Sequence, residues 1–373
     1  MAKKRILLMY ISENSGHHHA SLAIESALHE ASNDTEIRNV NSFLYTNPIL
    51  EKIINKVYMS VIRRRPEIWG YLYDNPKVVK STQRLKEAIH KYASNKIKTL
   101  FEEFMPQAVI CTQAFPCGIV ADYKRTHALD MVVAGVLTDY APHSYWLYDN
   151  VDAYFVPSEE TKKSLILNGI SSDKVHFTGI PIDLKFRDTV DKKSVFRSLG
   201  FSDTEPVILV MGGSQGIGPV KEIVKILNTS KVKLQVIVVA GGNKKLYNYL
   251  KQKVPQLHGR CVVFAYTEKI NELMEISDLV ISKPGGITVS EALSKGLPVL
   301  IVNPIPGQEE MNTRHLVKHK VAVKLDNLHD LEIFVKEFLS NPLALKNMQN
   351  RARALSRPGS AANIAETILG MIG

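Results

Sequence analysis

Two glycine-bearing loops, each directly after a short apolar run, could bind a phosphate. One is Gly212-Gly213-Ser214-Gln215-Gly216 after the run 206–211, and the other is Lys283-Pro284-Gly285-Gly286 after the run 278–281. Glycine lets a backbone amide approach a ligand, and a helix that starts behind such a loop adds unpaired N–H groups and the positive end of its dipole. Neither loop has the spacing of a dinucleotide-binding GxGxxG motif or of a P-loop. Each alone could be an ordinary strand–turn–helix connection, but two of them in one region favour a diphosphate.

His17, in the polar loop after the first apolar run (residues 5–11), is a candidate general base. A neutral imidazole at the end of a strand, beside a helix N-terminus that lowers its pKa, can take a proton from a hydroxyl group. Two more histidines follow directly, but adjacent histidines in a loop rarely all face one ion, so we expect no metal site. His143 is a second candidate base, four residues after Asp139. Asp139 follows a predicted strand, where it either orients a histidine or starts a turn.

Gln308 and Glu309 are candidates for binding a sugar. They follow the apolar run 299–302, in a loop that also contains proline and glycine. A carboxamide and a carboxylate presented there could bind sugar hydroxyl groups by bidentate hydrogen bonds. The alternative is a solvated polar loop.

The elements that must position these residues predict an α/β protein. The opening strand, glycine-bearing loop, helix (about 20–31) and strand (36–40) are typical of a doubly wound sheet, which binds ligands at the carboxyl ends of its strands. At 373 residues the chain fits two domains of about 150–200 residues. We predict a first domain over 1–185 and a second domain over 186–355. A last helix within 356–373 is expected to cross back to the first domain.

Charge is concentrated in one segment. The net charge is +10 and the pI about 9.2, and residues 43–104 hold twelve Lys or Arg against six acids. Aromatic residues lie among these bases, as in Arg63-Arg64-Arg65 followed by Trp69. Such a mixture suits an anionic bilayer surface, and the alternative is a solvated helical face. We find no nucleic-acid-binding motif, no run long enough to span a membrane and no secretion signal, so we expect a cytoplasmic protein at the inner face of the membrane.

Five motifs in one order resemble the monogalactosyldiacylglycerol synthase and processive diacylglycerol glucosyltransferase family. The motifs are Gly16-His17-x-x-Ala20, Thr138-Asp139 with His143 and Trp146, Gly179-Ile180-Pro181, Lys283-Pro284-Gly285-Gly286-Ile287-Thr288-x-x-Glu291-Ala292, and Pro306-Gly307-Gln308-Glu309. The resemblance implies a GT-B fold, in which two doubly wound, Rossmann-like domains face each other across a cleft. Residues 1–185 would form the acceptor-binding and membrane-associating domain, and residues 186–355 the UDP-sugar-binding domain. A looser resemblance is to the N-acetylglucosaminyltransferase of peptidoglycan assembly, which also has a Gly-Gly-Ser-Gln-Gly loop.

The resemblance also implies roles for individual residues. His17 would be the catalytic base, and Asp139 an acceptor-side or orienting residue. Residues on the acceptor or membrane side would be Gly16, Arg63, Arg64, Arg65, Trp69, His143 and Trp146. Residues that bind the donor would be Gly213, Ser214, Tyr266, Lys283, Pro284, Gly285, Gly286, Ile287, Thr288, Glu291, Gln308 and Glu309.

The prediction is therefore a metal-independent transfer of a hexose from a UDP-sugar to diacylglycerol, with glucose favoured over galactose. The UDP-sugar is a co-substrate, and no cofactor is expected. Helix dipoles and loop amides would stabilise the departing UDP in place of a metal. The alternatives are a transferase acting on an undecaprenyl-linked precursor, a soluble UDP-sugar epimerase and a non-catalytic UDP-sugar sensor.

Overall fold

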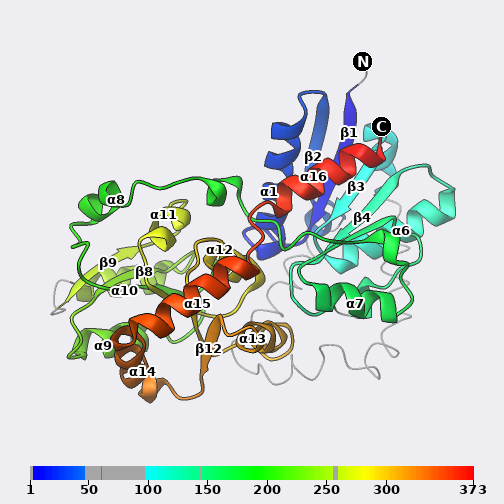
Figure 1. Cartoon of the computed structure of the whole chain (residues 1–373). Coiled ribbons are helices and arrows are strands. Elements are labelled where there is room, and N and C mark those ends of the chain that lie inside the picture. Colours follow the sequence, from blue (N-terminus) through cyan, green and yellow to red (C-terminus); the bar gives the residue numbers. More distant parts are fainter. Residues whose placement is uncertain (1–2, 47–59, 61–96, 143, 255–258) are drawn as a thin grey trace. The chain divides into compact units, whose positions relative to one another are not determined.

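The computed structural model describes residues 3–46, 60, 97–142, 144–254 and 259–373 (Figure 1). The contacts divide the chain into two compact units. Unit 1 comprises Met1–Leu184, Ile305–Gln308 and Arg357–Gly373, and unit 2 comprises Lys185–Pro304 and Glu309–Ser356. Most of the basic segment 43–104 lies outside the described residues, as do the predicted site residues Arg63, Arg64, Arg65, Trp69 and His143.

Unit 1 is built on a six-stranded parallel sheet of order β2-β1-β3-β4-β5-β6. Its strands are β1 (Lys4–Tyr10), β2 (Thr35–Asn41), β3 (Ala108–Cys111), β4 (Val132–Val136), β5 (Ala153–Val156) and β6 (Val175–Phe177). Its labelled helices are α1 (Gly16–Ala31), α2 (Ser42–Thr46), α6 (Ala114–His127), α7 (Glu159–Leu167) and α16 (Ser360–Met371).

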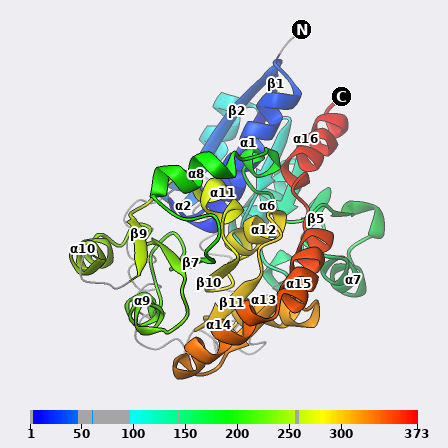
Figure 2. The same cartoon turned by 60° about the vertical axis from the view of Figure 1, so that its left-hand side comes forward.

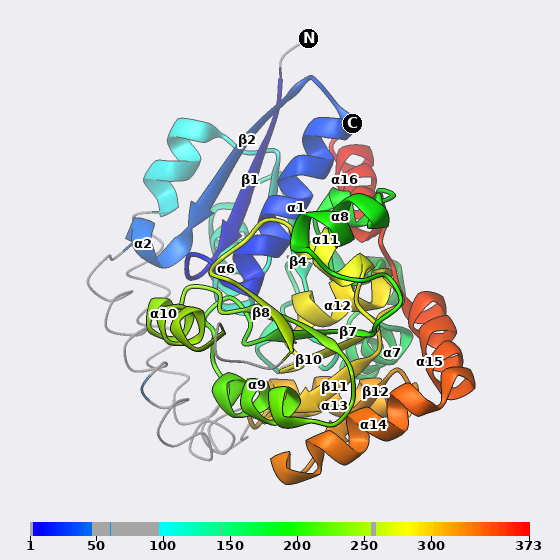
Figure 3. The ribbon, with the colours of Figure 1, turned by 90° about the vertical axis from the view of Figure 1, so that its left-hand side faces the viewer.

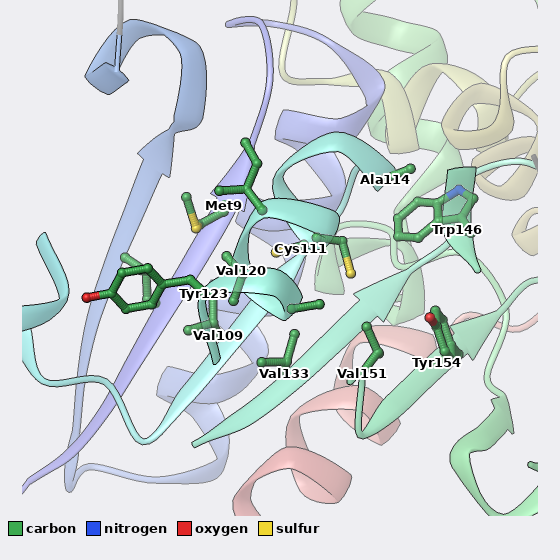
Figure 4. Close-up of a cluster of buried hydrophobic side chains, with 14 of the residues drawn as sticks. Met9, Val109, Cys111, Ala114, Val120, Tyr123, Val133, Trp146, Val151 and Tyr154 are labelled. Atoms are coloured by element: carbon green, nitrogen blue, oxygen red, sulfur yellow. The ribbon is translucent and has the colours of Figure 1, made fainter. Parts of the chain in front are cut away.

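Helices cover both faces of this sheet, which explains why its inner strands β3, β4 and β5 are continuous apolar runs, whereas the edge strand β2 is mostly polar. Successive side chains of a strand point to opposite faces. On β1, Ile6 and Leu8 pack in one cluster with α1 and α16, and Leu7 and Met9 pack in the other with α6. Figure 4 shows the second cluster, where Met9, Val109 and Val133 from neighbouring strands meet side chains of α6.

Unit 2 repeats the design with a parallel sheet of order β12-β11-β10-β7-β8-β9. Its strands are β7 (Val207–Met211), β8 (Gln235–Val239), β9 (Arg260–Phe264), β10 (Leu279–Ser282), β11 (Val299–Val302) and β12 (Ala322–Leu325). Its helices are α8 (Lys192–Leu199), α9 (Val220–Thr229), α10 (Lys244–Lys253), α11 (Ile270–Glu275), α12 (Gly286–Ser294), α13 (Gln308–Lys318), α14 (Leu331–Ser340) and α15 (Pro342–Leu355). Helices α9, α10 and α14 pack on one face, and α15 packs against α12 (Figures 2 and 3).

Each sheet has a topological switch point. In unit 1 the chain places β2 on one side of β1 and β3 on the other, and in unit 2 it places β8 on one side of β7 and β10 on the other. Connections that leave neighbouring strands in opposite directions open the sheet edge to a ligand at the strands' carboxyl ends. The predicted doubly wound α/β class is confirmed. None of the helices within the described residues is long and apolar enough to cross a membrane.

Helix α16 should contribute directly to the stability of unit 1. Ile364 is fully buried in the cluster that contains Ala23 and Ile24 of α1. Ile364→Ala should lower the free energy of unfolding by about 2–5 kcal/mol, because it removes buried methyl groups and leaves a cavity. Urea denaturation measures the change, and Glu366→Ala on the exposed side of the same helix is the control. Equal stability of the two variants would contradict the packing described for α16.

Candidate active site

His17 lies in the first turn of α1 rather than in the loop predicted from the sequence. The helix begins at Gly16, four residues earlier than expected, because Ser15 caps it. The Ser15 hydroxyl accepts a hydrogen bond from the His18 N–H (3.2 Å) and donates one to the Ile11 carbonyl oxygen (2.9 Å). The cap joins the end of β1 to the helix and so places His17 at the switch point of the sheet.

The His17 ring is held by two residues that follow neighbouring strands. Its Nδ1 lies 2.9 Å from the carbonyl oxygen of Thr112, after β3, and 3.0 Å from Oγ1 of Thr138, after β4. A carbonyl oxygen can only accept, so Nδ1 carries the proton and Nε2 keeps its lone pair. The Thr112 hydroxyl also donates to the His17 carbonyl oxygen (2.9 Å). The fold therefore presents Nε2 of His17 as a proton acceptor.

The environment also favours the neutral form of His17. Burial lowers the pKa of His17 below its ordinary value of 6.5, although the charge of Asp139 and the bond to the Thr112 carbonyl act in the opposite direction. A histidine that is neutral at pH 7 can act as a base. Asp139 thus lies close enough to influence His17 electrostatically, as the sequence suggested for an orienting acid.

Trp146 and Gly16 occupy different surroundings. Trp146 is 7% exposed and belongs to the apolar core of unit 1. Its ring lies over Gly135 of β4, where a Cβ atom would be 3.1 Å from the indole (Figure 4 shows the ring in the core). Gly16, by contrast, is exposed. The structure therefore gives Trp146 a packing role in the core of unit 1. Its predicted place on the acceptor side stays a prediction.

In unit 2 the loop after β7 is tightly packed against the loop after β8. Gly216 and Gly241 both have φ of 58°, and a Cβ atom on them would lie 2.1 Å from the Ala240 oxygen and 2.6 Å from the Ser214 oxygen respectively. The Gly242 N–H donates to the Ser214 carbonyl oxygen (2.8 Å). Only glycine fits at these two positions. At the tip, Gly213 has no heavy atom of the described residues, other than its chain neighbours, within 4 Å of its Cβ position.

Helix α12 starts without a side-chain cap from the described residues. Gly285 is its N-cap, and apart from the chain neighbours no heavy atom of the described residues lies within 4 Å of the Cβ position of Gly285. Ile287 and Thr288 are partly buried in the first turn, as is Glu291 further along the helix. Uncapped N–H groups together with the helix dipole favour an anion at this end. The phosphate site at the Pro-Gly-Gly loop stays a prediction, with which a helix start that no described side chain caps is compatible.

Gln308 and Glu309 form the first turn of α13, where the sequence predicted a loop. Glu309 accepts a hydrogen bond from the Lys283 ammonium group (2.8 Å), and the two side chains are only 7% and 13% exposed. Asn312 of the same helix donates to the Pro284 carbonyl oxygen (3.0 Å). These two contacts join the start of α13 to the loop before α12. Glu309 is already hydrogen-bonded to Lys283 in this structure.

Some of these contacts were not predicted from the sequence. Neither Thr112 nor Asn312 belongs to a motif that the sequence analysis identified. Thr112 directly follows a strand, and Asn312 lies within a polar helix. Tyr266 lies after β9 and is 51% exposed, so it is accessible to a ligand. Its predicted role in holding a nucleotide base stays a prediction.

Two family models match the chain. The model described as monogalactosyldiacylglycerol (MGDG) synthase matches residues 17–182, and the model described as glycosyltransferase family 28 C-terminal domain matches residues 207–366. The chain is 28% identical over 368 residues to a processive diacylglycerol beta-glucosyltransferase of Bacillus mycoides (strain KBAB4), covering 98% of the chain and 93% of the relative. It is 27% identical over 370 residues to the protein of that name from Bacillus subtilis (strain 168), covering 98% and 95%.

Solved structures share the fold. MurG of Acinetobacter baumannii aligns with a TM-score of 0.67 and 15% identity, covering 99% of this chain and all (100%) of that one. The UDP-GlcNAc 2-epimerase of Neisseria meningitidis aligns with a TM-score of 0.62 and 16% identity, covering 98% and 100%. These neighbours are GT-B enzymes, so the predicted fold class is confirmed, and at such identities the likeness concerns the fold alone.

The titration of His17 should show the effect of its surroundings directly. NMR titration of the imidazole should give a pKa below 6.5, and Asp139→Asn should lower it further by removing the negative charge that favours the imidazolium. Asp122→Asn, which removes a surface carboxylate near Arg125, is the matched control and should leave His17 unchanged. A higher pKa in the Asp139→Asn variant would contradict the assigned interaction.

The Lys283–Glu309 pair should behave as a coupled unit in unfolding experiments. Lys283→Met and Glu309→Gln should each lower the free energy of unfolding by about 3 kcal/mol, because each removes one partner of a largely buried ion pair. The double variant should cost less than the sum of the two, since it leaves no lone charge. The exposed pair Lys98–Glu102 is the control, and its variants should change stability by less than about 1 kcal/mol. Strict additivity at Lys283 and Glu309 would contradict the pairing.

Proposed function

We propose that this chain, a glycosyltransferase of the monogalactosyldiacylglycerol synthase family with a family 28 C-terminal domain, transfers glucose from UDP-glucose to diacylglycerol. The relatives that match nearly its whole length are named processive diacylglycerol beta-glucosyltransferases. This agreement supports both substrates and favours glucose over galactose.

The single observation that carries the chemistry is the arrangement of His17. Its Nδ1–H donates to the Thr112 carbonyl oxygen, so Nε2 is the ring nitrogen that carries the lone pair. In the proposed reaction Nε2 accepts the proton of the glycerol hydroxyl group while that oxygen attacks the anomeric carbon of the sugar. The bond from the anomeric carbon to the diphosphate oxygen breaks at the same time, and UDP leaves with the electron pair.

The donor is proposed to bind unit 2 at the carboxyl ends of its strands. The diphosphate would lie at the uncapped N-terminus of α12 and beside Gly213 and Ser214, where N–H groups stabilise the charge that develops on UDP. Glu291 would bind the ribose, and backbone groups next to Tyr266 would bind the uracil. Gln308 and Glu309 would bind the sugar, with Glu309 oriented by Lys283.

We further propose that the protein works at the inner face of the cell membrane, where diacylglycerol lies. The support is the sequence of residues 43–104, with twelve bases, six acids and interspersed aromatic residues. Each basic residue close to an anionic bilayer can contribute about 1 kcal/mol. The enzyme would then encounter its uncharged acceptor, diacylglycerol, in the bilayer to which it binds.

A direct assay tests the proposal. Radiolabelled UDP-glucose or UDP-galactose is incubated with the protein and anionic vesicles containing diacylglycerol, and the lipids are separated. We expect labelled glycolipid from UDP-glucose, and His17→Ala should lower kcat by about 10²–10⁴-fold, the usual contribution of a general base. UDP binding by calorimetry should be retained in that variant, and His29→Ala, on the exposed last turn of α1, is the control.

Other outcomes would replace the proposal. Label appearing only in a polyprenyl-linked acceptor would make the protein a transferase of a different lipid. Conversion of the UDP-sugar without any lipid would make it an epimerase. Near-normal turnover by the His17→Ala variant would remove the base assignment even if glycolipid forms.

A further inference from the structure

We propose that His18 is a positioning residue for His17, because it holds the loop before α1 in a left-handed backbone conformation. The inference rests on the proposed role of His17 as the base. His18 follows His17 in the first turn of α1, yet its side chain is directed at the preceding loop rather than at Thr112. No step of the proposed reaction uses His18 itself.

The loop between β1 and α1 adopts an unusual backbone without the help of glycine. Ser12 and Asn14 have φ of 65° and 56°, in the left-handed region. Residues with a Cβ atom rarely adopt this region, serine less readily than asparagine. Such a conformation persists only where the surroundings hold it, and it is commonly found next to active sites. The contacts of this loop therefore decide how α1 begins.

His18 provides one of these contacts. The backbone N–H of Asn14 donates to Nδ1 of His18, with 3.2 Å between the two nitrogens. An atom that accepts a hydrogen bond carries no proton, so neutral His18 has its proton on Nε2. Burial lowers the pKa of His18 below its ordinary value, although Glu13 and Glu25 act in the opposite direction. The neutral form that can accept from Asn14 is thus the favoured one.

The His18 ring is itself fixed by β1. It stacks on Tyr10 with 4.2 Å between ring centroids and 14° between planes. The Tyr10 hydroxyl donates to Oε1 of Glu13 (2.7 Å), which joins the strand end to the loop. Oε2 of Glu13 lies 3.5 Å from Nδ1 of His18, where only the protonated ring would form an ion pair. The strand end, the loop and the first helical turn are therefore connected through Tyr10, Glu13 and His18.

This connection bears on His17 because the loop and the helix start are continuous. The Ser15 N–H donates to the Ser12 carbonyl oxygen (3.4 Å), and the Ser15 hydroxyl accepts from the His18 N–H (3.2 Å). Loss of the Asn14–His18 bond would free the loop to leave the left-handed region and to shift the first turn. Thr112 would still hold the His17 ring. We therefore expect fewer enzyme molecules to have His17 correctly placed at any moment, and not a complete loss of the base.

Three variants separate this role from simple packing. His18→Phe keeps an aromatic ring to stack on Tyr10 but removes the acceptor, and it should lower kcat about tenfold (about 1.4 kcal/mol) with an unchanged KM for the UDP-sugar. His18→Asn, which places an oxygen acceptor close to the former Nδ1, should keep kcat near that of the parent protein. Asn14→Gly added to His18→Phe should restore kcat, because glycine adopts positive φ without the hydrogen bond.

Each result decides the proposal. His29→Phe on the exposed end of α1 is the control for a general effect of the substitution. Unchanged kcat in His18→Phe, equal loss in His18→Asn, or no recovery with Asn14→Gly would overturn the positioning role. If the parent protein forms no glycolipid, the proposed function fails, but NMR titration of His17 still tests the inference: His18→Phe should change the pKa of His17, and Asn14→Gly should reverse the change.

Discussion

Parallel pairing is the constraint on which both sites depend, because it brings the carboxyl ends of all strands to one edge of each sheet. His17 follows β1, Thr112 follows β3 and Thr138 follows β4, and these strands are neighbours in the order β1-β3-β4. Residues 121 positions apart in the sequence, His17 and Thr138, can therefore share a hydrogen bond. In unit 2 the same rule places Gly213 after β7 and Pro284 after β10, which are also neighbours. Each site is a consequence of strand order before any side chain is considered.

The hydrogen-bond partner of His17 Nδ1 determines the tautomer of the ring and influences its pKa. A carboxylate bonded to Nδ1 would stabilise the imidazolium and raise the pKa, whereas a carbonyl oxygen fixes the tautomer with a weaker effect on charge. Here burial has the largest effect on the pKa of His17, so the pKa falls although the charge of Asp139 and the bond to the Thr112 carbonyl both act to raise it. A pKa below that of free histidine leaves the ring neutral at pH 7. A lower pKa also makes His17 a weaker base in the reaction that we propose.

The sequence predicted the sheets well, because strands buried on both faces are short apolar runs that punctuating loops separate. It failed where a cap or a distant contact decides the result. The start of α1 was placed at about Ala20 because His17 to His19 look like a polar loop, but the Ser15 cap starts the helix at Gly16. The pairing of Lys283 with Glu309 could not be predicted, since it joins residues after two different strands. Thr112 was missed for a further reason: it holds His17 through its backbone carbonyl, and every residue type has that group.

The repeated glycine pairs of unit 2 show why composition alone does not identify a phosphate site. Gly216 and Gly241 are required by packing, since a Cβ atom on either would collide with a backbone oxygen of the neighbouring loop. Gly213 has φ of 66°, which favours glycine, whereas Gly285 has φ of −65°, which any residue can adopt. Among the described residues, and apart from its chain neighbours, no heavy atom lies within 4 Å of the Cβ position of Gly285, so packing does not explain the lack of a side chain there. Glycine that is not needed for packing at a helix start keeps backbone N–H groups open to an anion. The tightly packed glycines fix the loop, and the open ones leave room for the diphosphate that we propose it binds.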